Sequence, residues 1–274
     1  MQDHLRYESQ KVVSGLKFVD GLAWSRSGYL VAADVREKKI LRLGGGEPTP
    51  QELVANDGGA TGIAFDAQGR LYICESEARR LTRSDLKGKT ETLAETFDGK
   101  KLNGPHDVVV RRDGHVYFID PAFGTAVDQR ELGYYGIFHL GLKREFDAIA
   151  RWQTRPGGIT LSADGRTLYV TDADRHAMVA FDVGRNGEVD KPRDVLRNIA
   201  GVPGGIRTDA DGRYYIAARG IAVYTSAGKL ERTLMDSTNC TNCTFGEGDL
   251  GYLFAASRGD IYRIKMDVKG ALQY

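Results

Sequence analysis

The chain has 274 residues, 38 basic and 37 acidic side chains, a formal net charge of +1 and 41% hydrophobic residues. It lacks the basic excess that nucleic-acid binding requires, and no apolar run approaches the roughly 20 residues of a membrane span. The first seven residues contain no apolar signal core, and three cysteines are too few for a disulfide scaffold. We therefore expect a cytoplasmic protein whose partner is a small molecule, and neither nucleic acid nor a membrane.

One unit recurs six times along the chain: an apolar strand, a turn that ends in Gly, and a second apolar strand. The turn glycines, spaced by 39 to 51 residues, are Gly28, Gly69, Gly114, Gly165, Gly212 and Gly251. Asp-Gly between β-rich runs favours hairpins, because Gly adopts a positive φ at little cost. Third strands are expected at 39–43, 80–83 and 177–181, and residues 121–134 are expected to form a loop over one face.

A four-stranded unit of roughly 40–50 residues that repeats radially is typical of a β-propeller. The sequence therefore predicts an all-β fold: one domain, residues 1–274, forming a six-bladed β-propeller. A generic sandwich of hairpins is the alternative, and the fixed phase of the six copies argues against it.

The phase of the repeat also indicates a site, because the first strand of each blade begins, and the second ends, on the same face. Counting eight residues back from each turn Gly gives an inner ring of Asp20, Thr61, His106, Gly157, Gly204 and Cys243. Counting six forward gives an outer ring of Asp34, Glu75, Asp120, Thr171, Ala218 and Ser257. We expect the fourth and fifth blades to be one residue longer, which places Asp172 and Arg219 in the outer ring instead.

Asp20 and His106 are the candidate catalytic residues, because two titratable groups aimed into one channel suit acid/base work on water. Thr61 and Arg219 are candidates for orienting a polar or anionic substrate. Four further candidates for substrate binding are Glu75, Asp120, Asp172 and Cys243. The acids at the strand ends could instead have a structural role, in which they cap backbone amides. Cys243 could instead be a small buried thiol that only packs in the core.

Several stretches together resemble one family. They are Leu-Tyr-Ile-Cys-Glu at 71–75, Arg-Arg-Leu-Thr-Arg at 79–83, Lys-Leu-Asn-Gly-Pro-His-Asp at 101–107, Tyr-Phe-Ile-Asp-Pro at 117–121, Arg-Pro-Gly-Gly at 155–158, Val-Pro-Gly-Gly at 202–205 and Thr-Phe-Gly at 244–246. Over residues 18–264 the chain resembles the gluconolactonase/regucalcin (senescence-marker-protein) family of six-bladed propellers. The resemblance implies a hydrolase of sugar lactones that holds one divalent cation, often calcium or zinc, in its central channel.

The chain departs from that family at four positions. Asp20 stands where the family has a ligand Glu, and His106 where it has an Asn that contacts substrate or the metal-bound water. Gly157 replaces a ligand Asn, and Gly204 replaces the Asp that is both ligand and favoured base. Hard cations want six to eight oxygens, so we expect no metal ion and no other cofactor, and we expect the two glycines to widen one side of the channel.

The leading hypothesis is a hydrolase that acts without a metal on a lactone or a related cyclic or ester substrate, with Asp20 and His106 as acid and base. An isomerase or lyase with the same pair is a close variant, since proton transfer needs no metal. A propeller that binds a small molecule without catalysis is the alternative from another class. A third possibility is a rebuilt zinc or manganese site made from Asp20, His106 and Glu75.

Overall fold

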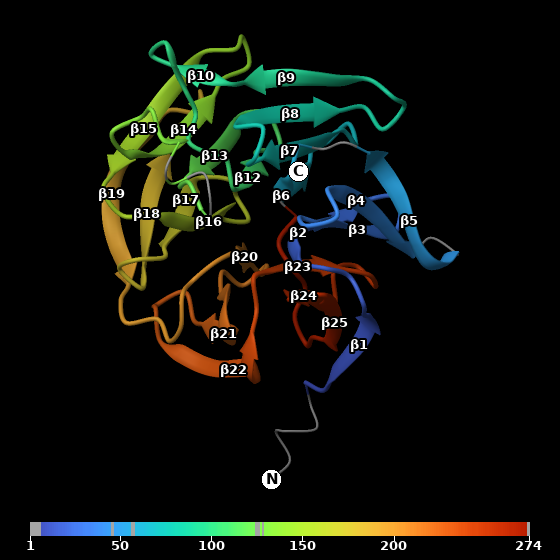
Figure 1. Cartoon of the computed structure of the whole chain (residues 1–274). Helices are drawn as coiled ribbons and strands as arrows, with labels where there is room; N and C mark the ends of the chain where they lie inside the picture. The colour runs from blue at the N-terminus through green and yellow to red at the C-terminus, as the bar shows by residue number, and fades with distance from the viewer. Residues whose placement is uncertain (1–6, 45–46, 56–57, 124–126, 128, 273–274) are drawn as a thin grey trace.

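The computed structural model describes residues 7–44, 47–55, 58–123, 127 and 129–272. In these ranges the chain forms six sheets arranged around one central axis, together with a small two-stranded hairpin (Figure 1). The prediction of an all-β, six-bladed propeller is confirmed. Over the same ranges the structure has no helix with the length and apolar character needed to cross a membrane.

Each sheet runs from an inner strand beside the axis to an outer strand at the periphery (Figure 1). Blade 1 contains β2 (Val19–Ser25), β3 (Tyr29–Asp34), β4 (Lys39–Gly44) and β5 (Glu47–Ala55). Blade 2 contains β6 (Ala60–Phe65), β7 (Leu71–Glu75), β8 (Arg80–Ser84) and β9 (Thr90–Ala94). Blade 3 contains β12 (Asp107–Val110), β13 (Val116–Asp120), β14 (Tyr135–Leu140) and β15 (Phe146–Trp152). Blade 4 contains β16 (Pro156–Leu161), β17 (Thr167–Asp172), β18 (Ala177–Val183) and β19 (Val189–Leu196). Blade 5 contains β20 (Ile206–Thr208), β21 (Tyr214–Tyr224) and β22 (Leu230–Asn239). Blade 6 contains β23 (Asn242–Gly246), β24 (Tyr252–Ser257), β25 (Asp260–Lys265) and β1 (Ser9–Val13).

Blades 5 and 6 depart from the simple repeat. In blade 5, β21 supplies both middle strands: its first half pairs with β20, its second half pairs with β22, and Gly220 lies between them at a φ of 79°. In blade 6 the outer strand is β1, where Ser9 pairs with Ile264 of β25. The two ends of the described chain therefore close the ring in a single sheet. The hairpin of β10 (Thr96–Phe97) and β11 (Lys100–Lys101) lies outside the blades.

The core lies between neighbouring sheets. Along β13, Val116 and Phe118 pack towards blade 2, whereas Tyr117 and Ile119 pack towards blade 4. This alternation follows from the two-residue period of a strand. Burial of each large apolar side chain of this kind stabilises the fold by about 1.5–3 kcal/mol. The packed layers therefore hold the inner strands at a fixed depth in the channel. The start of each inner strand thereby becomes a rigid position for a functional group.

The turns confirm the repeat in five blades and change its phase in the sixth. The predicted turn glycines of blades 1 to 5 have φ between 68° and 102°. In blade 6, Gly246 pairs with Tyr252, and the longer connection holds four residues at positive φ, Glu247, Gly248, Asp249 and Leu250. The corresponding pair in blade 1, Ser25 with Tyr29, is joined by three residues. The count from Gly251 therefore misses the inner ring by two positions.

Candidate active site

Six residues at the starts of the inner strands form the ring at one mouth of the channel. They are Asp20, Thr61, His106, Gly157, Gly204 and Thr241. Asp20, Thr61 and Gly157 lie within β-bulges, where the inner strand carries one residue more than its partner. A bulge turns a side chain away from its regular direction. Hydrogen bonds between blades fix the other positions, as with Gly205 N donating to Thr241 O at 3.0 Å.

Asp20 and His106 meet across the mouth. His106 Nε2 lies 3.1 Å from Asp20 Oδ2, and the two side chains are 19% and 8% exposed. Burial alone would lower the pKa of His106, but the charge of Asp20, its hydrogen bond and the charge of Asp107 raise that pKa above its ordinary value of 6.5. His106 Nδ1 is buried without a hydrogen-bond partner. The charge of Asp20 therefore favours the protonated form of the His106 imidazole.

The backbone around His106 is tightly fixed. Gly62 N donates to His106 O at 2.6 Å, and a Cβ on Gly62 would lie 2.4 Å from the Cα of Asp107. Only glycine lets blade 2 approach blade 3 so closely. The Thr61 hydroxyl lies 3.3 Å from both Cys74 O and Pro105 O. The hydroxyl thus bridges backbone groups of two blades next to His106, and the predicted role of Thr61 in orienting substrate stays a prediction.

Two residues that the sequence did not indicate lie beside the pair: Phe123 contacts His106, and Arg155 lies over Phe123. The ring of Phe123 meets the imidazole edge to face, with centroids 4.6 Å apart. The Arg155 guanidinium lies 5.3 Å from the centroid of Phe123 and also pairs with Asp174, with Nε 3.0 Å from Oδ1. The repeat carried no signal for these side chains, because they lie in connections before and after the strands. Within the predicted loop 121–134, residues 124–126 and 128 lie outside the described residues.

A second acid, also missed, lies directly behind the pair. Asp107 is 1% exposed, and its two oxygens accept hydrogen bonds from Val108 N at 3.0 Å and Ile159 N at 3.1 Å. Burial raises the pKa of Asp107, and the charge of Arg207 opposes that rise. Asp107 thus joins blade 3 to blade 4 and adds negative potential beneath His106.

The strand-end acids are occupied by structural partners. Asp34 accepts from the amides of Lys17 and Phe18, and Asp120 accepts from those of Asn103 and Gly104 at 2.7 Å each. Burial raises the pKa of Asp120 to about 6, against the effect of those two amides.

The two remaining acids predicted to bind substrate are held in the same way. Asp172 accepts from the Thr154 hydroxyl at 2.6 Å and from the Arg175 amide. Glu75 accepts from Arg80 at 2.5 Å and from the Thr82 hydroxyl at 2.8 Å. The structure therefore shows Glu75, Asp120 and Asp172 as caps and supports of the blades, and their predicted role in substrate binding stays a prediction.

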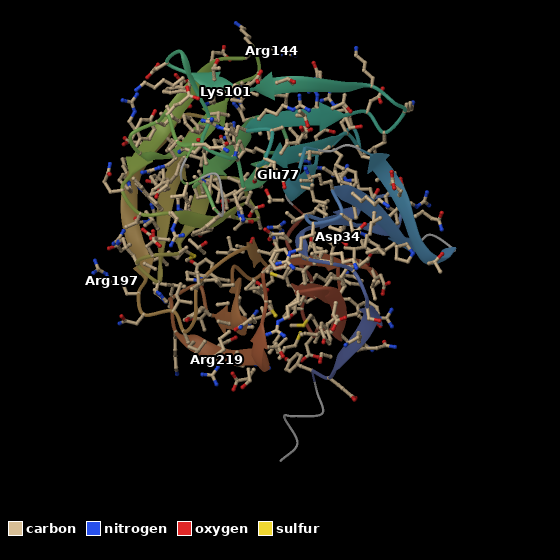
Figure 2. The ribbon with its side chains drawn as sticks, in the orientation of Figure 1. Asp34, Glu77, Lys101, Arg144, Arg197 and Arg219 are labelled. Carbon is tan, nitrogen blue, oxygen red and sulfur yellow. The ribbon has the colours of Figure 1, made fainter. Side chains whose placement is uncertain are left out.

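Two predicted positions shift because of turn length. Blade 5 has the ordinary three-residue turn, so Ala218 takes the outer position, and Arg219 lies one residue beyond it with its side chain 60% exposed at the periphery (Figure 2). Cys243 lies two residues past the ring, fully buried in the layer between blades 5 and 6. Burial raises the pKa of its thiol to about 12. Neither residue faces Asp20 and His106.

The ring does not fit the divalent cation that the family resemblance implies. A Cβ on Gly157 would lie 2.1 Å from Pro203 O, and one on Gly204 would lie 2.6 Å from Thr241 O. Neighbouring backbone thus fills the space that the glycines were expected to open, and the expectation of a widened channel is corrected. No group of three or more His, Cys, Asp or Glu side chains with the spacing of a metal site occurs among the described residues. Glu75 does not join Asp20 and His106 in such a group.

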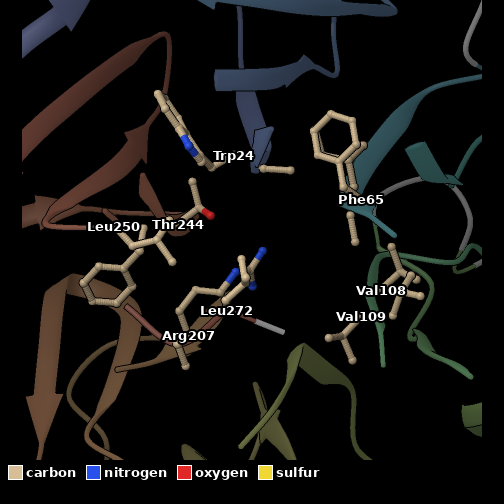
Figure 3. Close-up of a pocket in the computed structure, with 14 residues that line it drawn as sticks. Trp24, Phe65, Val108, Val109, Arg207, Thr244, Leu250 and Leu272 are labelled. Atoms are coloured by element: carbon tan, nitrogen blue, oxygen red, sulfur yellow. The ribbon is translucent and has the colours of Figure 1, made fainter. Parts of the chain in front are cut away.

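A separate cavity lies at the turn end of the inner strands. Its wall is largely apolar, with Phe65, Val109 and Leu272 among its members, and Arg207 is its charged residue (Figure 3). The guanidinium donates to the carbonyl oxygens of Ile206 and Leu22 at 2.7 and 3.3 Å. The interior space of about 50 Å³ holds a few water molecules and little more.

The fold and the ring can now be set beside known proteins. Residues 18–259 match the SMP-30/gluconolactonase/LRE-like region. A gluconolactonase of Zymomonas mobilis is 26% identical, covering 94% of this chain and 81% of its own length. The structure of a gluconolactonase from Xanthomonas campestris has a TM-score of 0.86 at 27% identity, covering 94% of this chain and 89% of the other.

A more distant structure shares the fold alone. The calcium-binding protein regucalcin from Agrobacterium tumefaciens has a TM-score of 0.82 at 18% identity, covering 97% of this chain and 96% of the other. The family match covers all six inner strands, from β2 to β23, and with them the whole ring. The resemblance found in the sequence motifs is thereby confirmed, and the chain belongs to the SMP-30/gluconolactonase/LRE-like family.

Proposed function

We propose that this protein hydrolyses a lactone or a related cyclic ester, with Asp20 and His106 as the catalytic pair and without a divalent cation. The observation that carries the proposal is the contact of 3.1 Å between His106 Nε2 and Asp20 Oδ2 at the channel mouth. The relatives named gluconolactonase support a lactone as the substrate.

The pair supplies both proton transfers that lactone hydrolysis requires. The Asp20 carboxylate takes a proton from a water molecule while the oxygen of that water bonds to the lactone carbonyl carbon. The bond between that carbon and the ring oxygen then breaks, and the His106 imidazolium gives its proton to the departing ring oxygen. Transfer of a proton from Asp20 to His106 restores the pair. One water is consumed, and the product is a hydroxy acid that releases its carboxyl proton near neutral pH.

The test is a pH-indicator assay on sugar, aliphatic and aromatic lactones, with and without chelator. The native chain is expected to acidify at least one of them equally in both conditions. Asp20→Asn and His106→Gln are expected to lose about 10²–10⁴-fold in rate, the usual contribution of a positioned acid or base. The matched control is Arg197→Gln, because Arg197 is 70% exposed at the periphery (Figure 2).

Four outcomes would contradict the proposal. Loss of activity in chelator, with recovery on addition of one cation, would mean that a metal takes part. Full activity in both Asp20→Asn and His106→Gln would remove the pair from the chemistry. A product that contains no oxygen from ¹⁸O-labelled water would indicate an isomerase or lyase, and binding without any product would indicate a binding protein.

A further inference from the structure

We propose that the substrate is a lactone with an apolar or aromatic substituent, and not a polyhydroxylated sugar lactone, and that Phe123 selects it. This inference rests on the proposed function and adds the substrate class. The observation that carries it is the position of Phe123, whose ring lies 4.6 Å from the imidazole of His106. A substrate that reaches the catalytic pair therefore meets an aromatic surface beside it.

The position of Phe123 is held from the far side. The Arg155 guanidinium lies over the ring at 5.3 Å and is itself fixed by Asp174, which it contacts through Nε and Nη2. A cation over an aromatic face is a favourable contact of about 0.5–1 kcal/mol at an exposed site. Because Asp174 balances the charge of Arg155, this side of the mouth presents no excess charge to an anionic substrate. A neutral, apolar group fits it best.

The rest of the ring offers few partners for substrate hydroxyl groups. The Thr61 hydroxyl is engaged by Cys74 O, Pro105 O and the Ser76 hydroxyl, the last at 2.9 Å. Gly157 and Gly204 contribute no side chain, and the backbone of Pro203 and Thr241 fills the space next to them. The exposed residue beside Pro203 is Val202, with an exposed fraction of 63%. A sugar lactone would therefore exchange hydrogen bonds to water for contacts that do not replace them, which costs binding free energy.

The effect on selectivity is limited in size and can be measured. Apolar surfaces discriminate between substrates by about 10–200-fold for a small apolar group. We compare kcat/KM for three lactones: glucono-1,5-lactone, δ-valerolactone, which has the same ring without hydroxyl groups, and dihydrocoumarin, which carries a fused benzene ring. The expected order is dihydrocoumarin first, δ-valerolactone second and glucono-1,5-lactone last, with about tenfold or more between the first and the last.

Phe123→Ala isolates the aromatic contact. It is expected to lower kcat/KM for dihydrocoumarin about tenfold, which is the value of an aromatic contact of roughly 1.4 kcal/mol, and to change kcat/KM for δ-valerolactone less than threefold. Phe123→Leu keeps an apolar side chain of similar size and is expected to recover part of the loss. The control is Leu142→Ala, because Leu142 is 60% exposed and follows β14. Thermal unfolding of each variant confirms that the fold is kept.

The outcomes separate this inference from the proposed function. Hydrolysis of none of the three lactones overturns the proposed function and this inference with it. Hydrolysis with glucono-1,5-lactone preferred keeps the proposed function and overturns the substrate class. A Phe123→Ala variant that loses the same factor on all three lactones also overturns the inference, because Phe123 would then act on His106 and not on the substituent. The predicted order together with a selective loss supports it.

Discussion

Blade 3 carries two histidine sites at opposite ends of one hairpin, and they differ in what faces the imidazole. At the mouth, His106 precedes β12 and faces the carboxylate of Asp20 at 3.1 Å. At the turn end, His115 Nδ1 lies 2.8 Å from His139 Nε2, and both residues are buried. The first histidine meets an acid and the second meets another base. Burial is common to both sites, and the partner decides their chemistry.

The charges around the second pair do not reverse the effect of burial. Burial and the nearby Arg111 lower the pKa of His115, and Asp113, Glu145 and Glu188 oppose this only in part. Burial and His115 lower the pKa of His139, against Asp147 and Glu145. Tyr117 stacks on His139 with centroids 5.1 Å apart. The hydrogen bond between the facing nitrogens has room for one proton, so it opposes protonation of both imidazoles at once.

The two sites therefore depend on pH in opposite directions. The pKa of His106 is raised on folding, so its contribution to stability is complete below the unfolded pKa of about 6.5 and is lost as pH rises through the folded value. The pKa values of His115 and His139 are lowered on folding. Their contribution is complete above about 6.5 and is lost as pH falls towards the folded values. Of the two sites, the mouth is the one whose surroundings favour the protonated histidine.

The largest expected effect comes from removing the acid that distinguishes the mouth. In Asp20→Asn, the pKa of His106 is expected to fall, because burial then acts without the opposing carboxylate. Loss of the nearby negative charge disfavours the imidazolium, and the fall in the His106 pKa is measured in an NMR titration of the imidazole Cε1 proton.

Asp98→Asn is the control for that titration, since Asp98 pairs with Arg151 at the surface and is 64% exposed. The titration of His106 should be the same in the control and in the native chain. An unchanged His106 pKa in Asp20→Asn would show that the contact across the mouth does not control the proton, and the comparison between the two sites would fail.

The next effect is on stability in acid. The contribution of the turn-end pair to the free energy of unfolding is expected to fall between pH 7.5 and pH 5.5, because the unfolded chain then binds protons that the folded pair resists. His139→Phe keeps the aromatic stack on Tyr117 but removes one of the two bases, so its loss over this range is expected to be smaller. Urea unfolding at pH 7.5, 6.5 and 5.5 measures both.

His106→Gln provides the matched comparison for the acid experiment. It leaves the turn-end pair intact and removes the opposing contribution of His106, so its loss of stability between pH 7.5 and pH 5.5 should equal or exceed that of the native chain. If His139→Phe loses as much stability as the native chain, the acid sensitivity arises elsewhere, and the pair His115–His139 is not its source.

The repeat predicted the fold and much of the ring because hairpin phase is a local property. Gly28 and Gly165 mark turns whose strands are paired as expected, and Asp172 reaches the predicted outer position because blade 4 is one residue longer. The same count placed Cys243 in the ring and failed. The turn in blade 6 contains non-glycine residues at positive φ, among them Asp249 and Leu250. No local sequence pattern predicted that this turn is longer than the others.

The contacts that give the site its chemistry connect distant parts of the chain. The sequence placed Asp20 and His106 in one ring but did not predict their contact, which depends on blade 2 approaching blade 3 through Gly62. Phe123 and Arg155 lie outside the strands, so the repeat carried no information about them. The repeat predicts where each strand begins, and tertiary packing decides which side chains from different blades come into contact.

The smallest expected effect tests whether charge or burial controls the turn-end pair. Asp113 is 45% exposed and pairs with Arg111 at 2.6 Å, and it favours the protonated form of His115. In Asp113→Asn the pKa of His115 is expected to fall further, because Arg111 then acts on the imidazole without its counter-charge. Because solvent screens an exposed charge, the free energy of the interaction between Asp113 and the protonated His115 is limited to about 0.2–1 kcal/mol. NMR titration of His115 measures it, and Arg111→Gln should move the same pKa upwards. If neither substitution changes the His115 pKa, burial alone holds the pair neutral, and the contrast with His106 reduces to the presence of Asp20.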